Sequence, residues 1–289
     1  MRFALVTLGS AGDLRPYLAI GAELARRGHS VHLLGQTPYS EQVEREGVRF
    51  LPVVGQREHD RTLEHPDLWH PIRGLGVLWR HLFVPAVEPT YGHLEALTGM
   101  SSDQLIVLAH PLAVGARFFR ERHAIRLLTG YTAPTSLRST CDPMFMGSWR
   151  VPSICPEFVR GALWQQLDAW KLEPMCRSRI ERWRSLWDTP SIRGSIFGQW
   201  LHSPDGGIAM FPRSFQMPCR DWPPQVQQFG FPVLTPSDSM PLSAEVVKFL
   251  EAGRPPVLLY GGSASSPLQG YQFDILASAA RSYGLRTIM

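Results

Sequence analysis

Charge is scarce in this sequence. Of 289 residues, 19% are Asp, Glu, Lys or Arg, and the formal net charge at pH 7 is +4. The basic residues are spread along the chain, and the densest group, between Arg177 and Arg184, is interleaved with acidic and apolar residues on an expected helix. A nucleic-acid-binding surface needs a continuous basic patch, so we interpret this group as a solvated helix face and expect no nucleic-acid partner.

Cysteine is also rare. The four cysteines, Cys141, Cys155, Cys176 and Cys219, include no Cys-x-x-Cys pair. No group of histidine, cysteine and carboxylate residues has the sequence spacing of metal ligands. The sequence therefore predicts reduced thiols, no disulfide framework and no bound metal. With no secretory leader at the N-terminus, it also predicts a cytoplasmic location.

Long apolar runs are missing too. No stretch reaches the roughly 18 residues of a membrane-spanning helix. The N-terminal run Phe3–Leu8 is too short for the core of a signal peptide. We expect a globular protein without a membrane span, a composition that still allows peripheral contact with the inner face of a membrane.

The first thirty residues carry the pattern around which the chain is organised. Phe3–Leu8 is typical of a buried strand, residues 9–13 (Gly-Ser-Ala-Gly-Asp) form a loop of small residues, and apolar residues then recur at helical spacing up to Gly28. A loop between a parallel strand and a helix lies at the carboxyl edge of the sheet, where open α/β folds bind ligands. The N–H groups at the start of the helix favour phosphates there.

Strands and helices alternate after this unit. Further strands are expected at 29–34, 48–54, 105–109, 125–131, 208–211 and 226–229. Helices are expected from Thr37 as N-cap to Gly47, over 72–97 with interruptions at Pro85 and Pro89, over 112–122, and over 158–187 with a break at Pro174. Residues 55–70 and 133–156 are expected to be loops, the second rich in Met, Phe and Trp and suited to an apolar ligand. The alternation predicts an α/β fold with a Rossmann-like, doubly wound parallel sheet.

The pattern restarts near the C-terminus. Residues 230–242 are proline-rich and are interpreted as a linker between an N-terminal domain, residues 1–229, and residues 243–289. In the last segment Ser243 caps a short helix, and a strand at 256–260, a small-residue loop at 261–266 and a helix at 269–283 repeat the opening pattern. Residues 285–289 are expected to begin another strand. Because these elements are too few to bury a core, we interpret them as the start of a second Rossmann-like domain that is C-terminally truncated.

Asp13 is the carboxylate of the first loop. An aspartate before a helix usually caps it, but Pro16 has no N–H to be capped, so part of the carboxylate is left for a ligand. In a dry cleft such a group can accept a proton from a hydroxyl as a general base. His110, at the end of the fourth expected strand, falls on the same sheet edge, where it is either a histidine at the edge of the core or a ligand contact.

Residues 9–16, Gly-Ser-Ala-Gly-Asp-Leu-Arg-Pro, with Gly28-His29-Ser30-Val31 after the helix, resemble the N-terminal domain of GT-B glycosyltransferases of the UDP-glycosyltransferase superfamily. A closer likeness is to the rhamnosyltransferase subunit of rhamnolipid synthesis. It rests on Asp67–Trp69, Gly76–Trp79, Gln199–Pro204, Asp221–Pro223 and Gly230–Pro232.

This resemblance implies a metal-independent hexosyltransferase that takes a UDP- or dTDP-linked sugar and no further cofactor. It would transfer a hexosyl group, such as rhamnosyl, with inversion to a hydroxyl of an apolar or lipid acceptor, for example a hydroxy fatty acid. Asp13 would be the catalytic base. The resemblance also implies donor contacts from Ser10, Gly12, Gly262 and Ser263, and we assign acceptor contacts to His110, Tyr131, Met144, Phe145 and Trp149.

The chain departs from the family pattern in two ways. Many relatives place a histidine in the first loop and an aspartate after the fourth strand, whereas this chain has Asp13 and His110 in the reverse order. The later donor motif, which carries glycine and histidine, has no counterpart before Met289. Activity of the chain as given is therefore an open question at this point.

Two alternatives remain open. A Rossmann-type, dinucleotide-dependent oxidoreductase would use the same glycine loop. However, the third glycine is absent, and Gly35-Gln36 stand where the ribose-binding acid is expected. The other alternative is a non-catalytic, truncated fragment that only binds the acceptor.

Overall fold

The computed structural model describes residues 1–289 except 100–103, 142–144, 147–148, 153, 235–241 and 261–266. Met144, Gly262 and Ser263 therefore lie outside the described residues. The chain divides into two compact units, Met1–Gly9 with Asp13–Leu234, and Ser10–Gly12 with Thr235–Met289. The domain and linker boundaries predicted from the sequence stay a prediction.

The first unit is built on a seven-stranded sheet in the order β3-β2-β1-β4-β5-β8-β9, in which every neighbouring pair is parallel. The strands are β1 (Arg2–Val6), β2 (Ser30–Gln36), β3 (Arg49–Val54), β4 (Leu105–Ala109), β5 (Arg126–Tyr131), β8 (Gly207–Ala209) and β9 (Val226–Gln228). This confirms the predicted α/β fold. The winding reverses after β3, because β4 pairs with the opposite side of β1, and the switch point therefore lies between β1 and β4.

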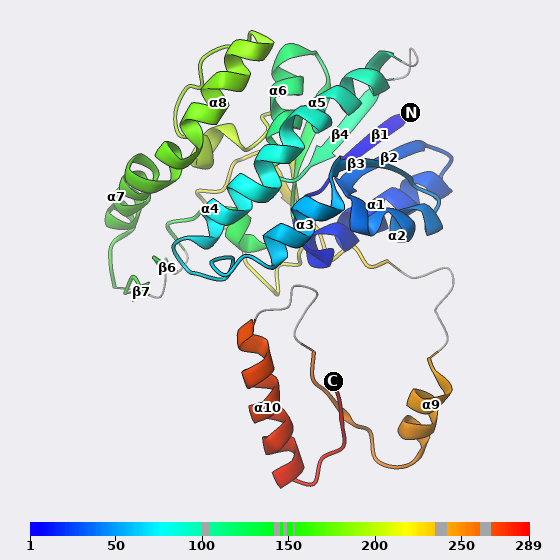
Figure 1. Ribbon diagram of the computed structural model, residues 1–289. Helices are drawn as coiled ribbons and strands as arrows, with labels where there is room; N and C mark the ends of the chain where they lie inside the picture. Colours follow the sequence, from blue (N-terminus) through cyan, green and yellow to red (C-terminus); the bar gives the residue numbers. More distant parts are fainter. Residues whose placement is uncertain (100–103, 142–144, 147–148, 153, 235–241, 261–266) are drawn as a thin grey trace. The chain divides into compact units, whose positions relative to one another are not determined.

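Helices cover both faces of this sheet (Figure 1). On one face lie α1 (Ala11–Arg26) and α2 (Ser40–Arg45), and on the other α5 (Val84–Gly99), α6 (Val114–Arg122) and α8 (Glu173–Trp187). The strands serve both layers in alternation: Leu5 packs with the α1 side, while Ala4 and Val6 pack with the α5 side. Among the described residues, no helix combines the length and apolar character needed to cross a membrane.

Two long helical stretches of the first unit, α4 (Gly74–Leu78) to α5 and α7 (Glu157–Leu167) to α8, each contain a π-helical segment. α4 continues through η2 (Trp79–Phe83) into α5, and α7 continues through η4 (Asp168–Leu172) into α8. The breaks predicted at Pro174 and Pro85 are confirmed in the same way, since η4 ends at Leu172 and η2 at Phe83, each two residues before the proline. At the end of η2 the Val84 N–H donates to Trp79 O. The break predicted at Pro89 is wrong, because Pro89 lies within α5.

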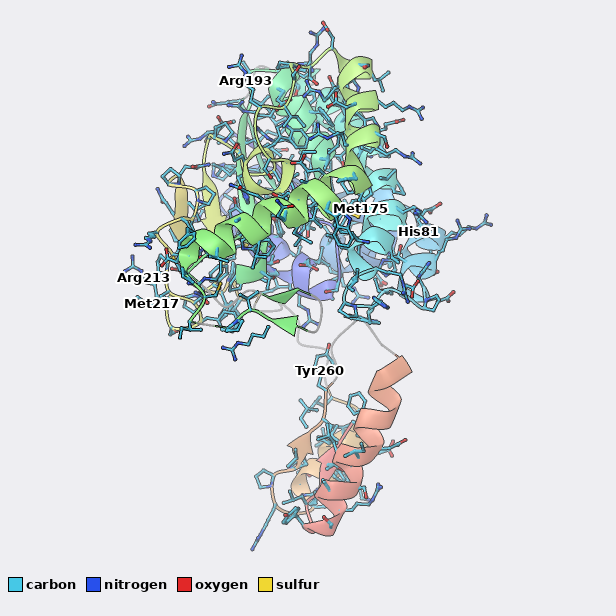
Figure 2. All side chains as sticks on the ribbon, turned by 90° about the vertical axis from the view of Figure 1, so that its left-hand side faces the viewer. His81, Met175, Arg193, Arg213, Met217 and Tyr260 are labelled. Atoms are coloured by element: carbon cyan, nitrogen blue, oxygen red, sulfur yellow. The ribbon has the colours of Figure 1, made fainter. Side chains whose placement is uncertain are left out.

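The two helical stretches contact each other through α8 and α4. Met175, near the start of α8, reaches α4, and a Cβ on Gly76 would lie 3.7 Å from its Sδ atom (Figure 2). The aromatic residues of these stretches mostly pack the core. Trp183 is buried in the core layer, and Trp187 stacks on Tyr91 with ring centroids 4.2 Å apart.

Two local predictions are wrong. Residues 55–70, predicted as a loop, contain α3 (Gln56–Leu63), whose buried side chains are His59 and Thr62. Because these side chains are polar, no apolar periodicity indicates the helix. Thr37 is not an N-cap: its hydroxyl donates to Val54 O at 3.1 Å, and the chain enters a 3-10 turn, η1 (Thr37–Tyr39).

The predicted loop 133–156 contains short regular segments. These are η3 (Pro134–Ser136) and an antiparallel pair of β6 (Phe145–Met146) and β7 (Trp149–Arg150). The side chains of Phe145 and Trp149 lie outside the described residues. After α8 the chain forms one more π-helical turn, η5 (Ile196–Trp200), before it enters β8.

The second unit has the elements that the sequence predicts for it. Ser243 caps α9 (Ala244–Glu251), its Oγ accepting from the Val246 N–H at 3.3 Å. β10 (Val257–Leu258) pairs in parallel with β11 (Thr287–Ile288), and α10 (Pro267–Ser282) lies between them in sequence. Val257 and Leu258 are 40% and 68% exposed, and Tyr260, labelled in Figure 2, is exposed as well. A nucleotide-sugar-binding role for this unit stays a prediction.

Candidate active site

Asp13 lies beside the switch point of the sheet. It occupies the first turn of α1 and does not precede the helix, which corrects its predicted position as a cap. Its Oδ1 accepts a hydrogen bond from Thr132 Oγ1 at 3.0 Å, and its backbone oxygen accepts one from Thr7 Oγ1 at 3.2 Å. Since Thr7 follows β1 and Thr132 follows β5, two strand ends hold this residue in place.

Gly9 allows the Asp13 carboxylate to approach the backbone closely. Its φ is 141°, and a Cβ at this position would lie 2.1 Å from Asp13 Oδ2, so a side chain would both strain the backbone and displace the carboxylate. The carbonyl of Gly9 accepts a hydrogen bond from the buried Gln36 amide. Gln36 stands at the end of β2, where a dinucleotide-binding fold has its ribose-binding acid. Here Gln36 occupies that position and holds the loop through its bond to Gly9, which disfavours the oxidoreductase alternative.

Ser10 and Gly12, the predicted donor contacts of the first loop, bond to each other. The Gly12 N–H donates to Ser10 Oγ at 3.2 Å. A phosphate oxygen at Gly12 would therefore have to replace the Ser10 hydroxyl as the acceptor.

His110 extends β4 at the same edge of the sheet. Its N–H donates to Val6 O at 2.8 Å, and its Nδ1 accepts from the Leu112 N–H at 3.2 Å. Nε2 therefore carries the proton of the neutral ring, which stacks on Phe83 with centroids 6.1 Å apart. Burial lowers the pKa of His110, and the Asp13 carboxylate acts in the opposite direction. At neutral pH the residue is thus a neutral imidazole that can donate from Nε2.

A cavity of about 540 Å³ opens next to His110 within the first unit. Its lining is mainly apolar with a few polar groups, and its size and character are typical of a small-molecule site. Apolar lining comes from Leu75, Pro111, Leu112, Pro134, Leu137, Trp164, Leu172, Phe197 and Leu201. Polar lining comes from His110, Thr135, Ser136, Arg138, Ser139, His202 and Gln216.

His202 is the second histidine of this cavity, and Tyr131 holds it from behind. Burial raises the pKa of Tyr131, so its hydroxyl stays protonated, and it lies 2.8 Å from His202 Nδ1. Burial is also the largest influence on His202 and lowers its pKa to about 4. At neutral pH the pair is therefore a neutral phenol hydrogen-bonded to a neutral imidazole, and Tyr131 supports the wall without lining it.

Arg138 and Trp164 are fixed on the far wall by bonds of their own. The Arg138 guanidinium donates to Asp168 Oδ2 at 2.5 Å and lies over the Trp164 ring at 4.5 Å. The indole Nε1 of Trp164 donates to Ser139 O at 3.2 Å, and Ser195 Oγ donates to the same Asp168 oxygen at 2.7 Å. These contacts join α7, η4 and the chain before η5 into one wall.

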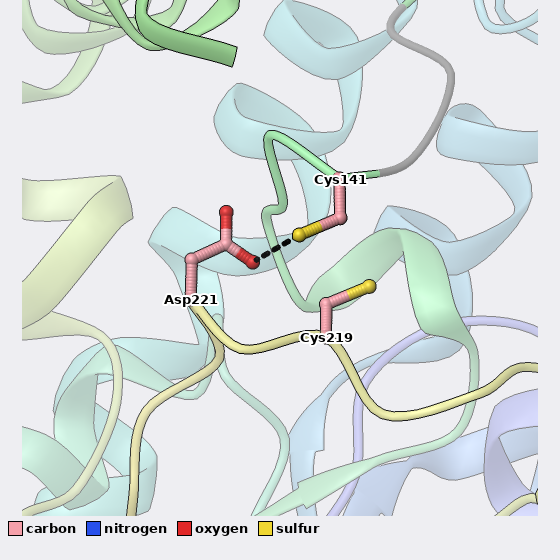
Figure 3. Close-up of side chains that lie close together, drawn as sticks. All are labelled: Cys141, Cys219 and Asp221. Atoms are coloured by element: carbon pink, nitrogen blue, oxygen red, sulfur yellow. Dashed lines mark hydrogen bonds between the residues drawn. The ribbon is translucent and has the colours of Figure 1, made fainter.

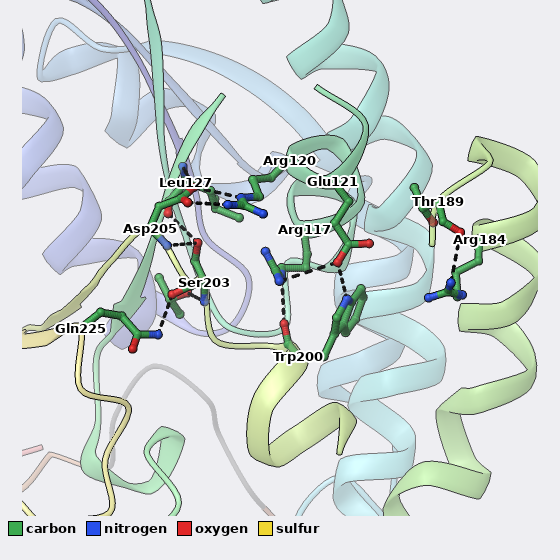
Figure 4. Close-up of polar contacts among 11 residues, drawn as sticks. Arg117, Arg120, Glu121, Leu127, Arg184, Thr189, Trp200, Ser203, Asp205 and Gln225 are labelled. Atoms are coloured by element: carbon green, nitrogen blue, oxygen red, sulfur yellow. Dashed lines mark hydrogen bonds and ion pairs between the residues drawn. The ribbon is translucent and has the colours of Figure 1, made fainter. Parts of the chain in front are cut away.

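The segment Gln199–Pro204, part of the family resemblance, is anchored to α6 and β5 (Figure 4). The Arg117 Nε donates to Trp200 O at 2.7 Å, and the Trp200 indole donates to Glu121 Oε1 at 2.6 Å. Ser203 Oγ donates to Leu127 O at 2.7 Å. The anchored segment delivers Leu201 and His202 to the cavity, so these residues position its wall.

Among the predicted acceptor contacts, the structure places His110 in the cavity wall and Tyr131 behind it. Met144 and the side chains of Phe145 and Trp149 lie outside the described residues. No sequence motif points to Thr132, Arg138 or Trp164 as site residues. His202 lies within Gln199–Pro204, a segment of the family resemblance, but nothing in that segment marks it as a cavity residue.

Comparison with known protein families gives one match along the chain. Residues 3–141 match the glycosyltransferase family 28 N-terminal domain. The matched region contains β1 to β5, residues 9–13, His110 and Thr132.

Similar proteins of known activity are glycosyltransferases. The chain is 26% identical over 268 residues to O-mycaminosyltylonolide 6-deoxyallosyltransferase of Streptomyces fradiae, a match that spans 91% of this chain and 61% of the relative. It is 24% identical over 280 residues to a sterol 3-beta-glucosyltransferase of Arabidopsis thaliana, spanning 93% of this chain and 43% of the relative. The chain thus covers less than two thirds of the length of these relatives.

Solved structures show the same fold. The glycotransferase of kitacinnamycin superposes with a TM-score of 0.59 at 18% identity, over 96% of this chain and 63% of that chain. The spinosyn forosaminyltransferase SpnP gives a TM-score of 0.55 at 11% identity, over 95% and 61% of the two chains. The α/β fold with its parallel sheet is therefore that of GT-B glycosyltransferase structures.

Proposed function

We propose that this chain acts in glycosyl transfer from a nucleoside-diphosphate sugar to a hydroxyl group of an apolar acceptor. The observation that carries the proposal is that Asp13, held by Thr132, acts electrostatically on His110, a residue that lines an apolar cavity. The family 28 match and the glycosyltransferase relatives support it. A hexosyl donor linked to UDP or dTDP, rhamnosyl included, is part of the same proposal.

Asp13 is the proposed base, and His110 is not. The Nδ1 of His110 accepts from the Leu112 N–H, so the neutral ring offers only a proton at Nε2 and has no lone pair there for an acceptor hydroxyl. Asp13 is acceptor-only, and its Thr132 bond occupies Oδ1 from one direction. The two residues therefore have different proposed roles: Asp13 accepts a proton from the acceptor hydroxyl, and His110 donates a hydrogen bond to the acceptor.

The proposed transfer is a single displacement with inversion. The acceptor hydroxyl gives its proton to Asp13 while its oxygen forms a bond to the anomeric carbon. The bond from that carbon to the diphosphate breaks, and the nucleoside diphosphate leaves with the electron pair. N–H groups at the start of α1 would stabilise the leaving group. The donor contacts expected from Gly262 and Ser263 are part of the same proposal.

The cavity suggests an acceptor that is mostly apolar and carries a hydroxyl. The named acceptor of the Arabidopsis relative is a sterol, and the name of the Streptomyces relative refers to a tylonolide. A molecule of that kind, or a lipid such as a hydroxy fatty acid, fits a volume of about 540 Å³ lined mainly by apolar groups. The predicted cytoplasmic location and peripheral membrane contact belong to this proposal.

The test is the substitution Asp13→Asn in a preparation that shows transfer. The amide keeps an oxygen for Thr132 but cannot take a proton, so turnover should fall by about 100-fold or more while folding is unchanged. Formation of glycosylated acceptor is followed by mass spectrometry with UDP- and dTDP-sugars, and circular dichroism checks the fold.

Thr132→Val is the matched control, since it removes the brace but leaves the base. We expect it to lower turnover by about 10-fold, less than the loss of the base itself. Near-normal turnover of Asp13→Asn would exclude the base role. Binding of NAD without binding of any nucleotide sugar would instead favour the dinucleotide alternative.

A further inference from the structure

Two cysteines and an aspartate converge at one place in the first unit (Figure 3). The Sγ atoms of Cys141 and Cys219 and a carboxylate oxygen of Asp221 all lie within 4.8 Å of one another. Cys141 follows the Pro134–Ser139 segment, while Cys219 and Asp221 come from the loop between β8 and β9. The sequence predicted no metal-ligand group, because these residues are separated by about eighty positions and only folding brings them together.

We propose that Cys141, Cys219 and Asp221 form a Zn²⁺ site. Two thiolates and a carboxylate are a donor set that suits this borderline-soft ion, and water would complete a tetrahedral shell. With Zn–S near 2.3 Å and Zn–O near 2.1 Å, tetrahedral angles place the two sulfurs about 3.8 Å apart and a sulfur and an oxygen about 3.6 Å apart. The separations in the structure, including 3.8 Å between Cys141 Sγ and Asp221 Oδ1, are within reach of this geometry.

The contact between Cys141 and Asp221 shows where the ion would go. The Cys141 thiol donates to Asp221 Oδ1 at 3.8 Å. Zn²⁺ would replace the thiol protons, so binding one ion releases one proton from each cysteine, and two Zn–S bonds and one Zn–O bond form. The two cysteines are only partly buried and Asp221 is exposed, so an ion can enter from solvent.

Asp221 is already oriented by the segment that carries Cys141. Ser139 Oγ donates to its Oδ1 at 2.8 Å, and the Thr140 N–H and hydroxyl donate to Oδ2 at 2.5 Å and 2.8 Å. Burial acts to raise the pKa of Asp221, but these hydrogen bonds outweigh it and the pKa is lowered. Such partners fix a ligating carboxylate and contribute to metal affinity.

The proposed site joins two loops that form part of the cavity wall. Ser139 precedes Cys141 by two residues and Gln216 precedes Cys219 by three, and both line the cavity. An ion shared between the loops would hold these two wall residues at a fixed separation. The site does not involve Asp13, so the metal-binding proposal can be tested separately from the proposed transfer activity.

The test is a Co²⁺ titration of the purified, reduced 289-residue chain, followed by absorption. One Co²⁺ per chain should give thiolate-to-metal charge-transfer bands and the intense visible bands of tetrahedral cobalt, and one equivalent of Zn²⁺ should remove them. A pH indicator should report release of the two thiol protons. Cys141→Ser and Cys219→Ser should each weaken binding by more than about 100-fold, and Ser139→Ala by about 10-fold.

Cys155→Ser is the matched control, because Cys155 is similarly exposed but lies outside the cluster. It should bind Co²⁺ as the unmodified chain does. Thiolate bands that persist in the double variant C141S/C219S would overturn the site. It would equally be overturned if the folded wild-type chain gave no such bands, or if mild oxidation joined Cys141 to Cys219 while the reduced chain bound no metal.

Discussion

β1 and β10 have similar sequences but different surroundings. Phe3–Leu8 and Pro256–Tyr260 are both short apolar runs followed by a loop of small residues. In β1, Ala4, Leu5 and Val6 are 0%, 1% and 0% exposed, between strands β2 and β4 and under helices on both faces. In β10, Val257 and Leu258 are 40% and 68% exposed, beside the single strand β11.

The difference shows what an apolar run specifies. The run determines that a strand forms and which residues alternate, because those properties depend on the local chain. Burial depends on how many layers pack against the strand, which the run does not contain. The same local signal therefore gives a core strand in the first unit and an exposed one in the second.

The largest expected effect is on core packing. Leu18→Ala on α1, where the side chain is fully buried, should lower the free energy of unfolding by about 3 kcal/mol, whereas Leu258→Ala on β10 should change it by less than about 0.5 kcal/mol. Denaturant unfolding of both variants, followed by circular dichroism, measures the pair. Equal losses of unfolding free energy in the two variants would mean that β10 is packed as tightly as the core of the first unit, which would contradict the comparison.

Acid should act on the first unit alone in the range where histidines titrate, since residues 235–289 contain no histidine. The folded pKa of His202 is about 4, below the usual 6.5, so the unfolded chain binds more protons between these values and stability falls as the pH is lowered through them. The loss from His202 should be on the order of 2 kcal/mol by pH 4.5. Thermal unfolding between pH 7 and 4.5 measures it.

His202→Asn is the matching variant, because its amide oxygen can accept from Tyr131 and it does not titrate. Its stability should fall less steeply with acid than that of the unmodified chain. Identical slopes for the two proteins would show that His202 is not responsible, and that the other buried histidines account for the loss.

The smallest expected effect is at two helix ends that share the same glycine conformation and the same hydrogen bonds. Gly28 after α1 and Gly284 after α10 have φ of 82° and 63°, with no atom near a Cβ at either position. Each helix end has the same pair of hydrogen bonds, His29 N–H to Leu24 O with Gly28 N–H to Ala25 O, and Leu285 N–H to Ala280 O with Gly284 N–H to Arg281 O. Alanine at either glycine should cost about 1 kcal/mol from the left-handed backbone.

Hydrogen exchange shows how far the destabilisation spreads from each substituted glycine. In Gly28→Ala it should lower protection across the first unit, since α1 belongs to a cooperative core, and in Gly284→Ala it should affect only the last turns of α10. A global loss of protection from the second substitution would contradict the comparison.

Much of the fold could be predicted from the sequence where apolar residues mark one face of an element. The strands β1 to β5 and α1 are of this kind, and their parallel order follows from alternation. α3 could not be predicted, since its inward residues are His59 and Thr62. Irregular segments precede Pro85 and Pro174 as predicted, whereas Pro89 lies within α5 without a break, because a missing N–H donor does not by itself determine whether the helix is interrupted.

The candidate site was predictable only at the ends of strands. Asp13 and His110 follow β1 and β4, so topology places them at one edge. Thr132, which bonds Asp13, and His202, bonded to Tyr131, are brought in by contacts across 119 and 71 residues, and nothing in local sequence indicates such pairs. The Cys141, Cys219 and Asp221 cluster was missed for the same reason.

The π-helical segment η4 has a consequence for how this protein can change. It separates α7, which carries Trp164 in the cavity wall, from α8, whose Cys176, Ile180 and Trp183 belong to the core. The wider turn shifts the angular register of the helix, so the faces before and after it need not coincide. Substitutions in α7 can therefore reshape this wall of the cavity while α8 keeps its packing in the core.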